Sequence, residues 1–106
     1  MIIKKSKNVP MNLYFDPENQ ANKLVQMGKL TLMPGERRPA EGFAMHVQDE
    51  YSYVISGEAH SVLEDGSDLV GKPGDAQLIE AGEKHYNYND TDKPAEVVWM
   101  LVERVD

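Results

Sequence analysis

Apolar residues recur along the chain in short runs that alternate with polar residues, and turn-forming pairs separate these runs. Asp65-Gly66 and Pro73-Gly74 are two such pairs, because glycine and proline favour the backbone angles of tight turns. The first of them lies between two runs and predicts a hairpin. We predict strands over residues 23–33, 43–48, 51–55, 59–64, 76–79, 85–88 and 97–102. This many short strands predicts an all-β fold, an antiparallel sandwich or barrel.

The segment before the first long run follows a different pattern. Asp16-Pro17-Glu18 could begin a helix, with aspartate as the cap, proline in the first position and glutamate in the first turn. Gly28 would end such a helix early. We therefore expect a turn or short helix over 16–20, followed by a strand from residue 23.

Length and composition bound the class of protein. A chain of 106 residues with 41% apolar and 27% charged residues is typical of one globular domain. We expect a single domain over 1–106, with an N-terminal extension over 1–22 and a barrel core over about 23–103. A strand near 1–14 is a candidate for packing on a second subunit, because a small barrel gains from covering its apolar edge strands.

Charge and cysteine content exclude several functions. Eighteen acidic and eleven basic residues give a net charge of −7, and no basic stripe is long enough to bind nucleic acid. The acidic excess disfavours anionic membranes, no apolar run approaches the ~20 residues of a membrane span, and no signal peptide is expected. The absence of cysteine excludes disulfides, thiolate metal sites and a cysteine nucleophile. A cytoplasmic location fits this cysteine usage.

Two histidines and one glutamate have the spacing of a metal site. Residues of equal parity share one face of a strand, so His46 and Glu50 can point to the same side, while His85 and Asn87 share the face of a later strand. In a small barrel, inward side chains of different strands converge on one cavity. Two imidazoles and a carboxylate there would hold Fe(II), Mn(II), Ni(II), Co(II) or Zn(II) and leave coordination positions free. The alternative is three hydrogen-bonded polar residues with no metal.

Two stretches of the chain resemble the motifs of a known family. Residues 42–57 contain the pattern His46-x3-Glu50-x6-Gly57, which resembles the second half of the first cupin motif. The second cupin motif resembles residues 74–89, Gly74-x5-Glu80-x-Gly82-x2-His85-x3-Asn89, with Glu80 in the place of a proline. The order of the motifs and the segment between them, 58–73, also match. The resemblance implies an antiparallel jelly-roll β-barrel, in agreement with the predicted strands.

The chain departs from the first motif at one ligand position. Cupins usually carry a histidine two residues before the position of His46, where this chain has Ala44. The resemblance therefore implies that His46, Glu50 and His85 hold one divalent transition metal. It also implies a homodimer and a metal-dependent enzyme of dioxygenase, decarboxylase, isomerase or lyase type that acts on an oxygen-rich small molecule. The alternatives are a module that binds or senses a sugar or organic acid, and a structural subunit of a larger complex.

Further side chains are candidates for the pocket wall: Gln26, Gln48, Tyr53, Gln77, Asn87 and Trp99. Three of the amides lie on strands that otherwise look buried, where they could bind a ligand or orient an imidazole. The amide of Gln48 shares a face with His46 and could replace the missing ligand. The two aromatic residues have core or interface packing as their alternative.

Other polar residues are expected outside the site. Strand parity favours an outward His60, facing solvent or a second subunit. Arg37 and Arg38 follow a turn and are expected in an exposed loop, with carboxylate binding as the alternative. Asn89 is expected to stabilise a turn through its side-chain amide.

Overall fold

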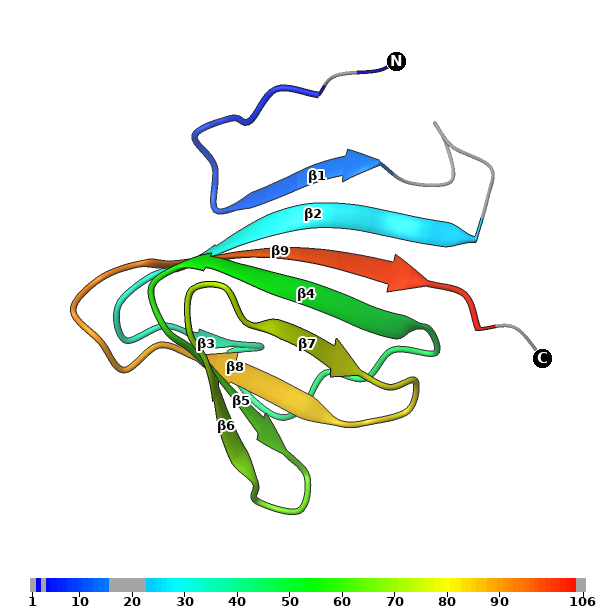
Figure 1. The fold of residues 1–106 in the computed structure, drawn as a ribbon. Helices are drawn as coiled ribbons and strands as arrows, with labels where there is room; N and C mark the ends of the chain where they lie inside the picture. Colours follow the sequence, from blue (N-terminus) through cyan, green and yellow to red (C-terminus); the bar gives the residue numbers. More distant parts are fainter. Residues whose placement is uncertain (1, 3, 16–22, 105–106) are drawn as a thin grey trace.

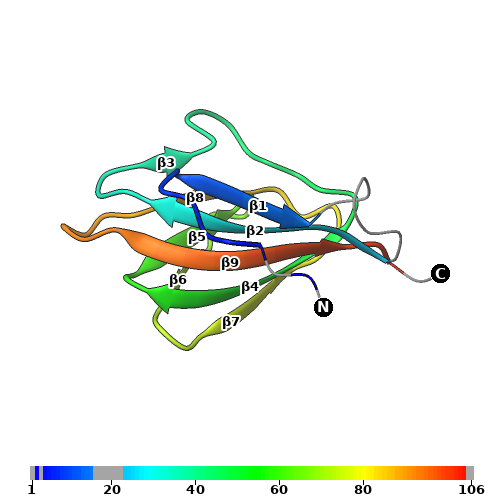
Figure 2. The same cartoon turned by 90° about the horizontal axis from the view of Figure 1, so that it is seen from above.

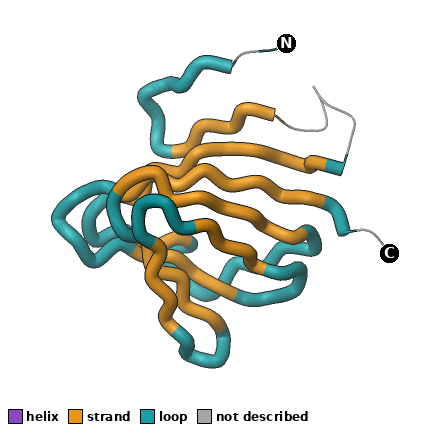
Figure 3. The backbone as a smooth tube through the Cα atoms, viewed as in Figure 1, coloured by secondary structure: helices purple, strands orange, loops and turns teal. Residues whose placement is uncertain are grey.

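A computed structural model of the chain describes residues 2, 4–15 and 23–104. Within this part all regular structure is β-strand, and no helix that could cross a membrane occurs there (Figure 3). The strands in Figure 1 are β1 (Met11–Phe15), β2 (Leu24–Leu32), β3 (Arg37–Arg38), β4 (Asp49–Ser56), β5 (Ala59–Leu63), β6 (Asp68–Gly71), β7 (Ala76–Ile79), β8 (His85–Tyr88) and β9 (Ala95–Val102). The turn or helix predicted over 16–20 lies outside the described residues.

The strands form two antiparallel sheets, as the alternating pattern predicts. One sheet has five strands in the order β1-β2-β9-β4-β7, and the other has four in the order β3-β8-β5-β6. Figure 2 looks onto the five-stranded sheet, with β5, β6 and β8 behind it. Strand β9 pairs with both β2 and β4 along its length. The end of the chain thereby joins the N-terminal strands to the middle of the sequence.

The register of the central strands sets which side chains face the space between the sheets. Trp99 of β9 pairs with Gly28 on one side and with Ser52 on the other. Paired residues of an antiparallel sheet point to the same face, and their neighbours along each strand point to the opposite face. Ser52 and Val54 of β4 are therefore buried, while Tyr51 and Tyr53 are exposed on the outer face.

The apolar core lies at one end of the two sheets. Its buried members, Leu32, Val54, Ala59, Ala95 and Val97, come from β2, β4, β5 and β9 and pack together. Burial of one leucine or valine side chain contributes roughly 1.5–3 kcal/mol. The core is small because the rest of the space between the sheets is a cavity.

Most of the predicted strands are found, and one prediction is wrong. Residues 43–48 form no strand; an isolated bridge from Ala44 to His85 is the only pairing there. Strands β3 and β6 were not predicted from the pattern. They have two and four residues, which is too short for alternation to be recognised.

Strand β1 belongs to the five-stranded sheet of its own chain. Leu13 pairs with Gly28, and Met11 pairs with Leu30. Part of the expected N-terminal extension is therefore a wall of the domain, and this strand is not free to pair with a second subunit along the edge that β2 occupies.

The predicted turns are formed by side chains and by glycine. Gly66 has φ 90° in the hairpin between β5 and β6, where the Ser67 N–H donates to Asp65 Oδ1. Asn89 is buried; its amide donates to the carbonyls of Leu32 and Lys93, and its Oδ1 accepts from the Thr91 N–H. The prediction that Asn89 stabilises a turn is confirmed.

Candidate metal centre

A cavity of about 690 Å³ lies between the two sheets, and its lining comes from both of them. Apolar residues such as Leu30, Leu32, Ile79 and Val97 form much of the surface. The polar side chains in its lining are Gln26, Glu36, Arg37, Arg38, His46, Glu50, Ser52, Gln77, His85 and Asn87. Cavities of about 300–1,000 Å³ are typical of small-molecule sites. Size and lining are therefore those of a site for a small organic molecule.

Backbone contacts of three segments position the predicted metal ligands. Glu50 is the second residue of β4, and its side chain faces inward. His46 lies in the loop before β4, where its carbonyl accepts a hydrogen bond from the Gly82 N–H at 2.8 Å. His85 begins β8 and exchanges two backbone hydrogen bonds with Ala44, at 2.8 and 3.0 Å. The loop, and not the strand that the pattern predicted, carries His46 to the cavity.

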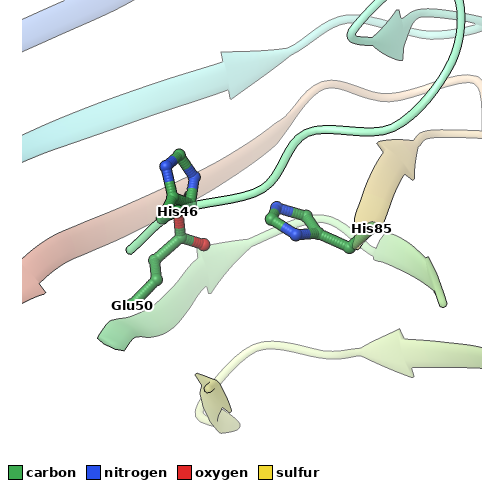
Figure 4. Close-up of side chains that lie close together, drawn as sticks. All are labelled: His46, Glu50 and His85. Carbon is green, nitrogen blue, oxygen red and sulfur yellow. Dashed lines mark ion pairs between the residues drawn. The ribbon is translucent and has the colours of Figure 1, made fainter. Parts of the chain in front are cut away.

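The three side chains point toward one another (Figure 4). One potential ligand atom of each residue lies within 4.8 Å of those of the other two. Nε2 of His46 is 3.3 Å from Oε1 of Glu50, and the two imidazole centroids are 5.6 Å apart. His85 is 3% exposed and the Glu50 side chain 16%. The group lies largely out of solvent, at the cavity wall.

The donor set and its spacing fit a divalent transition metal. Imidazole nitrogen and carboxylate oxygen are ligands that these metals prefer, and two such atoms at about 2.1 Å from one ion lie about 3.0–3.5 Å apart. The separation of 3.3 Å between His46 and Glu50 has this value. Nδ1 of His85 is 3.4 Å from the Glu83 carbonyl oxygen, at the long limit of a hydrogen bond, which favours Nε2 as its ligand atom.

In the protein without a metal, His46 and Glu50 form a pair whose strength depends on pH. The hydrogen bond to Glu50 raises the pKa of His46 above 6.5; partial burial opposes this shift, and charge attraction to Glu50 adds to it. A metal would take the place of this proton, because a ligating imidazole must be neutral.

Ala44 occupies the place beside His85 where cupins usually have a histidine. The two residues form an antiparallel bridge, so their side chains point to the same side of the backbone. Both line the cavity. A methyl group at this place cannot ligate a metal and leaves room next to the imidazole of His85.

Four of the six predicted pocket residues lie on the cavity: Gln26, Gln77, Asn87 and Trp99. The amide of Gln77 accepts a hydrogen bond from the Ser52 hydroxyl at 3.1 Å. The amide of Asn87 donates to the Ser61 hydroxyl at 2.7 Å. Both amides are thus held in place by neighbouring strands of their own sheets.

Gln48 and Tyr53 lie away from the cavity. Gln48 donates from its amide to Glu103 at the surface. The loop from 43 to 48 is not a strand, so the parity that Gln48 shares with His46 does not put both on one face. Tyr53 is 49% exposed, since β4 turns its odd residues to the outer face of the sheet.

Four polar residues on the cavity were not foreseen as part of its wall: Glu36, Arg37, Arg38 and Ser52. Ser52 follows Glu50 at the spacing of one strand face, so parity alone could have found it. Arg38 was expected in an exposed loop, but it lies in β3 and lines the cavity. A strand of two residues leaves no signal in the pattern.

His60 is on the outer face of the four-stranded sheet, as parity predicts. Its ring stacks on Tyr88 with 4.4 Å between centroids. Nδ1 is 2.8 Å from Asp68, and Nε2 is 3.3 Å from Asp90. Both ring nitrogens of His60 therefore face carboxylates of its own chain, away from the cavity.

The sequence confirms the family independently of this geometry. A profile of the cupin domain matches residues 28–101. This is more than half of the chain, which therefore belongs to the cupin family. A search of curated proteins finds no match.

Solved structures share the fold. The chain is 24% identical to a predicted oxalate decarboxylase from Thermotoga maritima, with a TM-score of 0.77 over 89% of this chain and 79% of that one. An RmlC-like cupin family protein with a double-stranded β-helix fold from Methanocaldococcus jannaschii is 16% identical, with a TM-score of 0.78 over 97% and 90%. A cupin-superfamily sugar phosphate isomerase from Silicibacter pomeroyi is 26% identical, with a TM-score of 0.65 over 78% and 52%. At 24% and 16% identity, the first two similarities show a shared fold and say nothing of function.

Proposed function

We propose that this cupin binds one divalent transition metal through His46, Glu50 and His85 and acts as a metal-dependent enzyme on an oxygen-bearing small molecule. One observation carries the proposal: ligand atoms from three separate segments lie within 4.8 Å of one another at the wall of a cavity of about 690 Å³. A bound metal would supply Lewis-acid chemistry to the substrate. Iron, manganese, nickel, cobalt and zinc all accept this donor set.

The chain's own residues bind and orient the substrate in this proposal. Ala44 leaves space beside His85. An oxygen of the substrate could therefore reach a metal held by the three ligands. The indole of Trp99 and the amides of Gln26 and Asn87 line the same cavity. The apolar surface between these polar groups excludes water. Decarboxylation and isomerisation, the reactions after which two solved relatives are named, are compatible with this arrangement, as are dioxygenation and lyase chemistry.

We infer in addition that the two sheets close into a jelly-roll barrel with the cavity inside. Side chains from both sheets line the cavity, and a solved relative of similar size has a double-stranded β-helix fold. A homodimer is part of the same proposal. The outer face of the five-stranded sheet exposes Tyr51, Tyr53, Ile55 and Leu78 by 43 to 49%, and an apolar face of this kind suits a second copy of the chain.

A module that binds a sugar or organic acid without turnover is the second candidate. Ala44 favours it, because the chain has one ligand fewer than is usual in the family. In this case the affinity for the small molecule would be the same with and without metal. In an enzyme whose metal contacts the substrate, added metal would increase that affinity.

The test of the proposed function is the metal content of the protein purified without a tag or chelator. We expect about one metal per chain in the wild type and loss of the metal in Glu50→Gln, because the amide is a far weaker ligand than the carboxylate. His46→Gln should lose it as well. The identity of the metal would then narrow the chemistry, with iron indicating oxygen activation.

Matched variants control for general damage. Glu41→Gln removes an exposed carboxylate, and His60→Gln removes an imidazole outside the cavity, so both should keep the metal. Equal metal content in the wild type and Glu50→Gln would contradict the proposal, and so would a wild-type protein that binds none of the five metals when they are added.

A further inference from the structure

Arg38 faces the cavity, whereas the guanidinium of its neighbour Arg37, a residue that also borders the cavity, lies over the ring of Tyr86. In the pairing of β3 with β8, Arg38 lies opposite Asn87 and Arg37 lies opposite Tyr88. Paired residues share a face. Asn87 lines the cavity, whereas the ring of Tyr88 stacks on His60 at the outer face. The side chain of Arg38 is 39% exposed, which places the guanidinium at the open side of the cavity.

The two guanidinium groups differ in the hydrogen bonds they have left to give. Arg37 donates to the carbonyls of Pro39 at 2.7 Å and Gly42 at 3.0 Å, and lies 3.8 Å above the ring of Tyr86. Both terminal nitrogens of Arg37 therefore already donate to the backbone. Arg38 donates only through Nε, to Glu36 at 3.3 Å, and its two terminal nitrogens have no protein partner among the described residues. This edge can bind a planar anion.

Glu36 holds Arg38 in this orientation. One carboxylate oxygen accepts from the Met33 N–H at 2.9 Å, and the other accepts from Nε of Arg38. The turn after β2 thereby fixes the carboxylate, and the carboxylate fixes the guanidinium. An arginine oriented in advance loses less side-chain entropy when it binds a ligand.

The surroundings of Arg38 favour a carboxylate over a phosphate. Two free N–H groups of a guanidinium match the two oxygens of a carboxylate. Glu36 and Glu50 also line the cavity, and their charges repel a dianion more strongly than a monoanion. Leu30, Val97 and Trp99 supply an apolar wall for the rest of the ligand.

We propose that Arg38 binds the carboxylate of the molecule that enters the cavity, so the substrate class is a small carboxylic acid with an apolar body. The relation of this molecule to the metal rests on the proposed function. The carboxylate contact does not, because neither Arg38 nor Glu36 belongs to the metal centre.

Binding can be measured in the metal-free protein with the chain's single tryptophan as the reporter. Trp99 lines the cavity, so a ligand that enters it changes the tryptophan fluorescence. We would titrate the protein with benzoate, with benzamide as the neutral isostere, and with phenyl phosphate. Benzoate should produce a saturable change and bind about tenfold or more tightly than either of the other two, as expected for charge-assisted hydrogen bonds to a monoanion.

Variants assign the contact to Arg38. Arg38→Met should weaken benzoate binding by about tenfold or more, and Arg38→Lys should fall between it and the wild type, because lysine keeps the charge but not the planar fork. Lys72→Met, which removes an exposed cation outside the cavity, should bind as the wild type does. Unfolding curves of all variants check that each is folded.

Three results would overturn the inference: no saturable change with benzoate, equal affinity for benzamide or phenyl phosphate, and unchanged benzoate affinity in Arg38→Met. Each of them leaves the measured metal content as it is. Failure of the carboxylate contact is thereby distinguished from failure of the metal centre.

Discussion

At the scale of single residues, the cavity wall depends on a glycine within a strand. Gly28 has no positive φ, so turn geometry does not explain it. A Cβ at this position would lie 2.7 Å from Cζ2 of Trp99 and 2.5 Å from the carbonyl oxygen of Asn12. The indole therefore lies against the bare backbone of β2. The close approach of β1, β2 and β9 at Gly28 positions the aromatic wall of the site.

Gly28→Ala should displace the indole and destabilise the protein. Overpacking of this kind costs about 1–3 kcal/mol, of which the lower backbone entropy of alanine returns a part. We expect a lower free energy of unfolding in denaturant and a shifted emission maximum of Trp99. Gly71→Ala is the matched control for the emission, because its Cβ would meet the amide of Gln77 and, at 3.0 Å, Cγ2 of Val54, but not the indole. Unchanged emission and stability in Gly28→Ala would refute this role.

At the scale of elements, β5, β6 and β8 are joined across their outer face by one polar network. The Tyr88 hydroxyl donates to Asp68, and His60 lies between Asp68 and Asp90. The hydrogen bond to Asp68 raises the pKa of Tyr88 from 10.0 to about 12. Hydrogen bonds from Tyr88 and His60 lower the pKa of Asp68 below 3.8. The network ties the short edge strand β6 to the rest of its sheet.

These pKa shifts predict how the loss of stability in Tyr88→Phe depends on pH. Because the pKa of Tyr88 is raised in the folded protein, its hydrogen bond to Asp68 contributes fully to stability below pH 10.0. This contribution is lost as the pH rises toward about 12. Because the pKa of Asp68 is lowered in the folded protein, its ionised carboxylate contributes fully to stability above pH 3.8. This contribution is lost as the pH falls through the pKa of Asp68 in the folded protein. Tyr88→Phe should therefore cost a constant amount between about pH 5 and pH 9, and less outside that window.

Denaturant unfolding at a series of pH values measures this difference. Tyr51→Phe removes a tyrosine from the other sheet and is the control. A cost of Tyr88→Phe that is independent of pH from acid to alkali would count against the hydrogen bond to Asp68.

At the scale of the whole molecule, the two faces of the five-stranded sheet have different roles. The inner face lines the cavity. The outer face carries Tyr51, Tyr53 and Ile55 on β4, with Leu78 of β7 paired opposite Tyr51. Stable dimers bury about 800 Å² on each partner. An apolar face of this kind is the surface that would form the interface of the proposed homodimer.

Charges on this face should separate the subunits. Tyr53→Glu combined with Leu78→Glu is expected to convert a dimer into a monomer, because the interface would bury two unpaired carboxylates. Light scattering during size-exclusion chromatography measures the mass directly. Leu69→Glu, on an exposed residue of β6 in the other sheet, should leave the dimer intact. A wild-type mass of one chain would exclude this assembly.

The sequence alone determined the strands that have a clear alternating pattern, the glycine turns between them, the cupin family and the three residues of the candidate metal centre. The strands and turns follow from local spacing, because strand parity and turn geometry depend on residues close together in the chain. The family and the three metal-site residues follow from the resemblance to the two cupin motifs, because His46 lies in a loop where parity does not apply. Only the tertiary structure placed Arg38 on the cavity and Gln48 and Tyr53 away from it. The orientation of Arg38 comes from its pairing with Asn87, a residue remote in the sequence. Gln48 lies in a loop where parity does not apply, and the outer side of β4 follows from its two neighbouring strands.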